Sequence, residues 1–168
     1  QYRDKVSSTK TMIKEALPLL KMARKHHVPF IINDRLDVCL AIDADGIHLG
    51  QEDMPVNVAR RILGQDKIIG LSCHGIPDIK KGQKEKVDYL GFGPVFKTAT
   101  KPESKPKGLR AFKRACELSR FPVFGIGGIT WDNLDKISCK GKIRIAVCRE
   151  LCLAQDVTEQ TRKLKEKI

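Results

Sequence analysis

Short apolar runs alternate with segments of helical periodicity along the whole chain. Apolar runs typical of buried strands lie at 28–33, 46–49, 67–72, 88–92, 122–126 and 143–148, and residues 1–5 look like the end of another strand. The segments between them predict helices at about 8–25, 35–42, 56–63, 109–119, 131–138 and 156–167, and one more that begins near Pro77. Strands that alternate with helices through short connections indicate an α/β fold with a parallel sheet.

Seven strands in this order are one fewer than a closed (β/α)8 barrel contains. Such barrels usually need about 200 residues or more, and this chain has 168. We therefore interpret residues 1–168 as a single domain, a (β/α)8 TIM barrel that lacks its first strand and helix in this chain. An open, doubly wound sheet is the alternative. It is disfavoured because the polar clusters follow the C-terminal ends of strands and no glycine-rich dinucleotide fingerprint follows the first strand.

Two predicted strands, 30–32 and 46–49, are each followed by polar residues that include a carboxylate, Asp34 after the first and Asp53 after the second. About thirteen residues separate the strands, which is the length of a crossover helix, so we expect the two carboxylates at the same rim of the sheet. Two carboxylates suit Mg²⁺, which leaves its other positions to water and substrate phosphate. A turn or helix N-cap formed by Asn33 and Asp34 is the alternative, and the second carboxylate disfavours it.

Further polar residues on this rim are candidates for binding phosphate. Gln1, Arg3 and Lys5 alternate along the first strand, so their side chains would point the same way, and the two cations would hold phosphate oxygens. A solvated chain end is the alternative. Ser72 ends the strand at 67–72 and would either donate its hydroxyl to phosphate or cap the next helix.

Two later segments also carry anion-binding chemistry. Polar loops as long as the one at 93–107 are usually functional or disordered. In a functional loop, Thr98, Thr100 and Lys101 would close over a bound anion. A lysine-rich surface loop is the alternative. Gly128 lies in the segment GIGGI at 125–129, between a strand and a helix, where backbone N–H groups can approach a phosphate. In barrels the phosphate site typically follows strands seven and eight. A tight structural turn is the alternative.

The charge of the chain is strongly positive, with 32 Lys and Arg against 20 Asp and Glu and a net charge of +12. The basic residues are spread over the whole chain and aromatic residues make up only 5%, which disfavours nucleic acid as the partner. We expect small phosphate-bearing molecules instead. The chain shows no apolar run of membrane-spanning length and no signal-peptide pattern, so the prediction is a soluble, cytoplasmic protein without a membrane partner. Whether it forms a homo-oligomer is left open.

The six cysteines do not form a Cys-x-x-Cys pair, the spacing that zinc ribbons and redox motifs use. They are expected to be small, reduced hydrophobic residues, as in the cytoplasm. A metal site that combines them with His26, His27 or His74 is the alternative, but no ligand spacing supports it.

Six motifs in order resemble those of the thiamine-phosphate synthase family: QYRDK, FIINDR, ADGIHLGQEDMP, IGLSCH, DYLGFGPVFKTATK and GIGGI, between residue 1 and about residue 134. The combination of HLGQEDMP with TATK is specific, whereas GIGGI alone is weak. The resemblance implies a (β/α)8 barrel that condenses hydroxymethylpyrimidine diphosphate with hydroxyethylthiazole phosphate. The products would be thiamine monophosphate and pyrophosphate. It also implies a transferase of a pyrimidinylmethyl group, with Mg²⁺ as cofactor and a dissociative reaction in which the bond to pyrophosphate breaks first.

The resemblance further implies a role for each candidate residue. Asp34 and Asp53 match the Mg²⁺ ligands, and Gln1 matches a contact to the pyrimidine. His48 would lie near the pyrimidine pocket or be a buried core histidine. The catalytic positions on the pyrophosphate side are matched by Arg3, Lys5, Ser72 and Lys101, and Asn33 matches a binding position on the same side. The positions that bind the thiazole phosphate are matched by Thr98, Thr100 and Gly128.

The chain departs from the family pattern at two places. Members normally carry a further strand and helix before QYRDK. Near the last strand, a glycine is usual where Arg144 stands and a small residue where Arg149 stands, although Arg149 is itself a candidate for binding phosphate. Two alternatives to a synthase are therefore kept. One is a paralogue similar to thiazole tautomerase, which the presence of Asp53 and Lys101 disfavours, and the other is a non-catalytic barrel that binds a phosphorylated metabolite.

Overall fold

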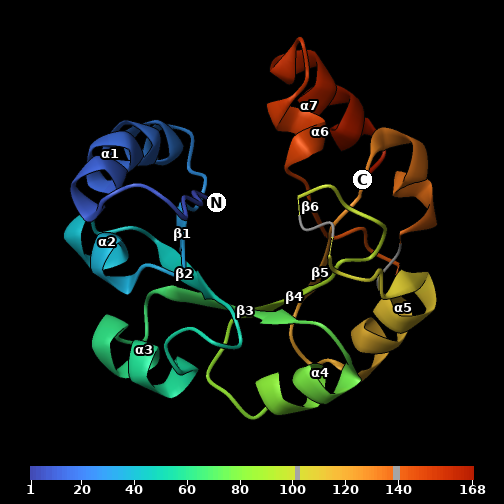
Figure 1. Cartoon of the computed structure of the whole chain (residues 1–168), viewed down its shortest axis with the longest axis horizontal. Helices are drawn as coiled ribbons and strands as arrows, with labels where there is room; N and C mark the ends of the chain where they lie inside the picture. Colours follow the sequence, from blue (N-terminus) through green and yellow to red (C-terminus); the bar gives the residue numbers. More distant parts are fainter. Residues whose placement is uncertain (101–102, 138–140) are drawn as a thin grey trace. The chain divides into compact units, whose positions relative to one another are not determined.

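The computed structural model describes residues 1–100, 103–137 and 141–168. These residues form two compact units. The first comprises residues 1–72 and 85–88, and the second comprises residues 73–84 and 89–168. Each unit is built from parallel strands that alternate with helices (Figure 1), so the predicted α/β class is confirmed.

The first unit contains the helices α1 (Thr9–Lys25), α2 (Leu36–Ala41) and α3 (Val56–Leu63). Its strands are β1 (Ile31–Asn33), β2 (Gly46–Leu49) and β3 (Ile68–Cys73), whose last residue belongs to the second unit. The strands are parallel and lie in the order β1-β2-β3, with Asn33 beside His48. This register brings the C-terminal ends of β1 and β2 to the same edge of the sheet.

Local sequence explains these elements. Ser8 caps α1 by accepting a hydrogen bond from the Thr11 N–H, and the helix buries Met12, Ala16 and Leu20, which recur every four residues along one face. All four residues of β2 are buried, as expected for a strand of a parallel sheet that is covered on both faces.

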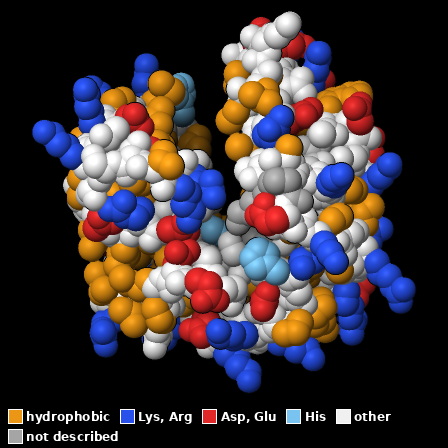
Figure 2. Space-filling view, viewed as in Figure 1, with side chains coloured by type: hydrophobic (Ala, Val, Ile, Leu, Met, Phe, Trp, Pro, Cys, Tyr) orange, Lys and Arg blue, Asp and Glu red, His pale blue; other side chains and the backbone are white. Residues whose placement is uncertain are grey.

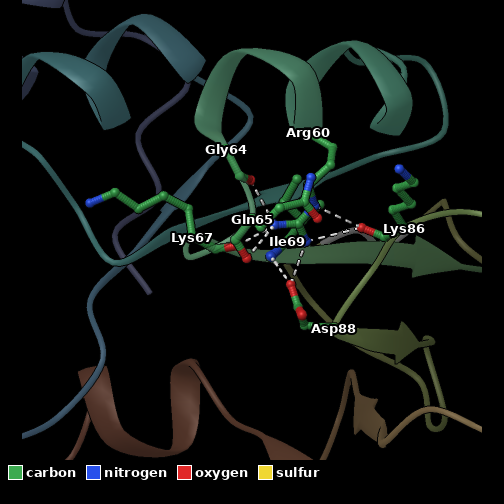
Figure 3. A network of polar contacts seen from close by, with 7 residues as sticks. All are labelled: Arg60, Gly64, Gln65, Lys67, Ile69, Lys86 and Asp88. Atoms are coloured by element: carbon green, nitrogen blue, oxygen red, sulfur yellow. Dashed lines mark hydrogen bonds and ion pairs between the residues drawn. The ribbon is translucent and has the colours of Figure 1, made fainter.

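Arg60 of α3 anchors the edge of the first unit opposite to the strand ends just described (Figure 3). Only 5% of the residue is exposed. Its guanidinium donates hydrogen bonds to the carbonyl oxygens of Lys67 at 2.6 Å, Lys86 at 3.0 Å and Gly64 at 3.1 Å, and it pairs with the Asp88 carboxylate at 2.7 Å. One buried cation thus satisfies backbone carbonyls at the end of α3 and on two connecting segments.

The second unit contains the strands β4 (Tyr89–Phe92), β5 (Val123–Ile126) and β6 (Ile145–Ala146), parallel and in that order. Its helices are α4 (Ile76–Gly82), α5 (Gly108–Leu118), the 3₁₀ helix η1 (Trp131–Lys136), α6 (Arg149–Cys152) and α7 (Val157–Glu166). Phe92 and Phe112 pack in its core with ring centroids 6.2 Å apart. A side chain at Gly125 would lie 3.2 Å from the Phe112 ring, which is a tight contact, so glycine at this strand position favours close packing of the ring.

The C-terminal residues are fastened to η1. Lys167 lies over the Trp131 ring, 3.4 Å from its centroid, and donates to the Asp135 carboxylate at 3.0 Å. Glu150 accepts hydrogen bonds from the Trp131 N–H and from the Gln160 side chain. These contacts join α6, α7 and η1 into one cluster.

Several predicted elements differ from the structure. Residues 1–5 do not form a strand, because only Tyr2 makes an isolated parallel bridge, to Ile32, so the described residues contain six strands rather than seven. The helix predicted at 131–138 is a 3₁₀ helix at Trp131–Lys136, where the Asn133 side chain accepts a hydrogen bond from the Thr130 N–H and donates one to the Gly128 carbonyl. The strand predicted at 143–148 is reduced to Ile145–Ala146, and the short helix α6 was not predicted.

The cysteines also differ in part from the expectation. Cys39 and Cys152 are free thiols, and burial raises the pKa of Cys39 to about 11 and that of Cys73 to about 12. Cys116 is disulfide-bonded, so the prediction of reduced cysteines is wrong at that position. Within the residues that the structure describes, no helix has both the length and the apolar character needed to cross a membrane.

Candidate functional site

Asp34 lies in a strained turn directly after β1. The Arg35 N–H donates to the Asn33 carbonyl at 2.7 Å, which closes a three-residue turn around Asp34, and the φ of Asp34 is 61°. A turn of this kind with positive φ at its central residue is rare and strained. The Asp34 N–H donates to the His48 carbonyl at 2.8 Å, which attaches the turn to β2. Such strain persists where surrounding contacts enforce it, and it clusters at functional sites.

Asp53 approaches Asp34 from the loop that follows β2, as the sequence predicted. The Gly50 N–H donates to the Asp53 carboxylate at 2.7 Å, and Asp53 lies within hydrogen-bonding reach of Asp34. Burial and then the neighbouring Asp34 carboxylate raise the pKa of Asp53. The Lys5 ammonium forms an ion pair with Asp34. Two carboxylates and one cation therefore meet at this edge of the first unit.

This arrangement fits a divalent cation with oxygen ligands. Two carboxylates in contact repel each other when both are ionised, and a bound cation removes that cost. Among the residues that the structure describes, no group of three or more His, Cys, Asp or Glu side chains forms an all-protein metal cage. A pair of carboxylates is the small ligand set that Mg²⁺ uses when water and substrate phosphate complete its coordination.

Ser72, near the end of β3, is held by two hydrogen bonds to residues of β2 and of the loop that follows it. His48 Nε2 lies 2.8 Å from the Ser72 Oγ, and the Gln51 side-chain amide donates to the Ser72 carbonyl at 2.6 Å. Only 8% of His48 is exposed, and burial lowers its pKa to about 4, although the charge of Asp53 opposes this shift. The imidazole is therefore neutral at physiological pH, and it contacts Ser72. The contact from Gln51 was not predicted, although the residue stands in the GQED motif.

The N-terminal residues contact β1 through backbone hydrogen bonds. The Tyr2 N–H donates to the Ile31 carbonyl at 2.9 Å, and the Asn33 N–H donates to the Tyr2 carbonyl at 3.0 Å. Arg3 and Gln1 are exposed, whereas Asn33 is buried. Lys5 is thus the predicted N-terminal residue whose side chain the structure places against Asp34.

In the second unit, the glycine segment packs against the loop that follows β4. Gly127 and Gly128 have φ values of 95° and 64°, and a side chain at Gly128 would lie 2.2 Å from the Lys97 carbonyl oxygen. The Phe96 N–H donates to the Gly127 carbonyl at 3.0 Å. These contacts explain structurally why glycine stands at positions 127 and 128. A role of Gly128 in binding phosphate stays a prediction.

The other candidates of the second unit are accessible. Thr98 is half-buried and accepts a hydrogen bond from the Thr100 N–H at 3.3 Å, and Thr100 is exposed. Arg149 is exposed at the first position of α6. Lys101 lies outside the described residues. The side chains of Lys and Arg are spread over the visible face of both units rather than gathered in one patch (Figure 2).

A family model described as thiamine monophosphate synthase matches residues 1–151, which is most of the chain. The chain belongs to the thiamine monophosphate synthase family. The resemblance seen in the sequence motifs is thus confirmed. The match includes the candidate residues of both units, from Gln1 to Arg149.

Individual members of the thiamine monophosphate synthase family are similar over nearly the whole chain. The thiamine-phosphate synthase of Persephonella marina is 46% identical over 165 residues, which cover 98% of this chain and 79% of that protein. The thiamine-phosphate synthase of a Synechococcus strain is 44% identical over 168 residues, but this chain spans only 48% of its length. The solved structure of thiamine phosphate pyrophosphorylase from Pyrococcus furiosus has a TM-score of 0.89 and 35% identity, and the match covers 98% of this chain and 79% of that one.

Proposed function

We propose that this chain catalyses the thiamine-phosphate synthase reaction, the condensation of hydroxymethylpyrimidine diphosphate with hydroxyethylthiazole phosphate. The observation that carries the proposal is the contact of Asp34 with both Asp53 and Lys5, in a chain that belongs to this family. A diphosphate leaving group needs cations to stabilise its growing charge, and this edge of the first unit offers an ammonium group and a fitting place for Mg²⁺.

In this proposal the chain works mainly by electrostatic stabilisation. When bound by Asp34 and Asp53, Mg²⁺ would offset the negative charge of the diphosphate. Lys5, Arg3 and Lys101 bind the diphosphate oxygens, and Ser72 donates its hydroxyl to them. The nucleophile is the thiazole nitrogen of the second substrate, so the enzyme supplies no covalent nucleophile and no strong base.

The remaining candidate residues recognise the two organic groups. Gln1 and His48 belong to the pyrimidine side, with His48 contacting Ser72 as described. Asn33 belongs to the diphosphate side, together with the cations named above. Thr98, Thr100, Gly128 and Arg149 belong to the side of the thiazole phosphate. We further infer a single (β/α)8 barrel domain, supported by the parallel strands and by the likeness to the Pyrococcus furiosus structure. A cytoplasmic location stays a prediction.

The deciding experiment measures pyrophosphate release by the purified chain with both substrates, first with Mg²⁺ and then with EDTA. Release should require both substrates and should stop with EDTA. Asp34→Asn and Asp53→Asn should each lower kcat by about a hundredfold or more, because each removes charge from the metal site. Asp66→Asn serves as the matched control, since Asp66 is an exposed carboxylate of the same unit. A folded chain that binds both substrates without releasing pyrophosphate would be a binding protein instead.

A further inference from the structure

The turn around Asp34 needs an anchor on its C-terminal side. On its N-terminal side, Asn33 is fixed in β1 by its register with His48. On the other side, Arg35 closes the turn through its backbone N–H. A strained conformation is kept only when its neighbours are held firmly, so whatever fixes Arg35 also fixes Asp34.

The Arg35 side chain makes four contacts with two helices. Its Nε donates to Asp37 Oδ1 at 2.9 Å, and its Nη2 donates to Asp37 Oδ2 and to Thr9 Oγ1, both at 2.5 Å. Its Nη1 lies 3.4 Å from the sulfur of Met12, a core residue with 1% exposure. Asp37 stands in the first turn of α2, and Thr9 and Met12 stand in the first turns of α1. A planar guanidinium is suited to such a bidentate contact with a carboxylate.

We propose that Arg35 is a positioning residue, whose guanidinium clamps the starts of α1 and α2 together and so holds the Asp34 carboxylate against Asp53 and Lys5. The clamp does not touch the Asp34 carboxylate directly. It acts through the backbone of the turn. Because the side chains of Arg35 and Asp37 are 36% and 52% exposed, their ion pair contributes little to the stability of the fold. The effect of the ion pair is instead to fix the position of the Asp34 carboxylate. This inference rests on the proposed function of Asp34.

The test uses Arg35→Lys, which keeps the charge but loses the planar fork. Arg61→Lys is the matched control, since Arg61 is an exposed arginine of the same unit. The first measurement is Mn²⁺ binding with inorganic pyrophosphate, followed by electron paramagnetic resonance, because this readout does not depend on turnover. Loss of an outer residue that orients a metal ligand typically weakens metal binding about ten- to a hundredfold. We expect a weakening in that range for Arg35→Lys, a matching fall in kcat, and an unchanged urea midpoint.

Asp37→Asn attacks the same clamp from its other side and covers the case in which Arg35→Lys folds poorly. The two changes should not add, since either one opens the clamp. Wild-type Mn²⁺ affinity in both variants would overturn the proposal, and so would a lower urea midpoint with unchanged affinity. If the unaltered chain binds Mn²⁺ but releases no pyrophosphate from its substrates, the proposed reaction fails while the clamp is still tested. If it does not bind Mn²⁺, the metal assignment and the clamp fall together.

Discussion

At the scale of single residues, burial decides the charge of His48. Its pKa is lowered to about 4 by burial, against 6.5 for an ordinary histidine, so the unfolded chain takes up a proton at a higher pH than the folded one. The unfolding free energy should therefore fall as the pH falls from about 6.5 to about 4, by about 3 kcal/mol from this residue. His48→Gln should remove this part of the pH dependence, as measured by urea unfolding at pH 7 and at pH 4.5.

His26→Gln is the matched control, because His26 is exposed at the end of α1. It should leave the pH dependence of unfolding as it is in the unaltered chain. An identical slope in the unaltered chain and in His48→Gln would show that His48 is not held neutral by burial.

Gly128 tests a second residue-scale effect, the difference between backbone strain and a steric clash. Both Gly128 and Gly64 have positive φ, 64° and 80°, but a side chain at Gly128 would meet the Lys97 carbonyl at 2.2 Å, whereas Gly64 faces open space. Gly64→Ala should cost about 2 kcal/mol of unfolding free energy from strain alone, because its φ of 80° and ψ of −170° lie in a region that essentially only glycine adopts. Gly128→Ala should cost about 4 kcal/mol or more, since the clash adds to the strain. Equal losses in urea unfolding would mean that the 94–97 backbone moves aside without cost.

At the scale of the elements, Arg60 holds α3 to the segments around it. Replacing it in Arg60→Met keeps much of the buried hydrocarbon but leaves the carbonyls of Gly64, Lys67 and Lys86 without their donor (Figure 3). Leaving buried acceptors unsatisfied costs about 1–3 kcal/mol each, and partial access to water reduces this. We expect a loss of about 3 kcal/mol in the unfolding free energy, measured by urea titration.

Arg61→Met is the control for this prediction, since the neighbouring arginine of α3 is exposed. It should change the unfolding free energy by less than about 0.5 kcal/mol, as surface substitutions usually do. Similar effects of the two changes would contradict the role of the Arg60 network.

The elements that the sequence predicted well are those whose pattern is local. The strand at 46–49 and the helix at 56–63 match the structure because a short, mostly apolar run and a helical pattern after Pro55 are both visible in the sequence. The strand at 1–5 was wrong because strand formation depends on pairing, and only Tyr2 pairs. The network of Arg60 could not be foreseen, since an Arg-Arg pair on a helix reads as exposed charge.

The candidate site follows the same division. The approach of Asp34 and Asp53 could be predicted, because strand order and crossover length place both at one edge. The strained turn, the Arg35 clamp and the contact of Gln51 with Ser72 could not, because they depend on side-chain geometry that joins separate segments. The roles of individual residues toward substrate stay predictions.

At the scale of the whole molecule, the net charge of +12 raises the question of which cations attract an anionic substrate. The basic side chains are spread widely (Figure 2). At physiological ionic strength, charges are screened over about 8 Å. Thr9, at the start of α1, contacts Arg35 of the Asp34 turn, and α1 has 17 residues, so Lys25 at its other end is about 25 Å farther along. Only cations close to the site, such as Lys5, should therefore act on a bound diphosphate.

This screening leads to a prediction that separates local from global charge. Raising NaCl from about 0.05 to about 0.5 M should raise the KM for the diphosphate substrate several-fold, with little change in kcat. The reason is that salt screens the attraction of the free substrate by distant cations, but not the ion pairs that are in direct contact at the site. At about 0.15 M salt, Lys5→Gln should raise KM, while Lys25→Gln, which removes the same charge from the far end of α1, should leave it unchanged. Equal effects of the two substitutions would show that the net charge of the molecule, rather than the cation paired with Asp34, attracts the substrate.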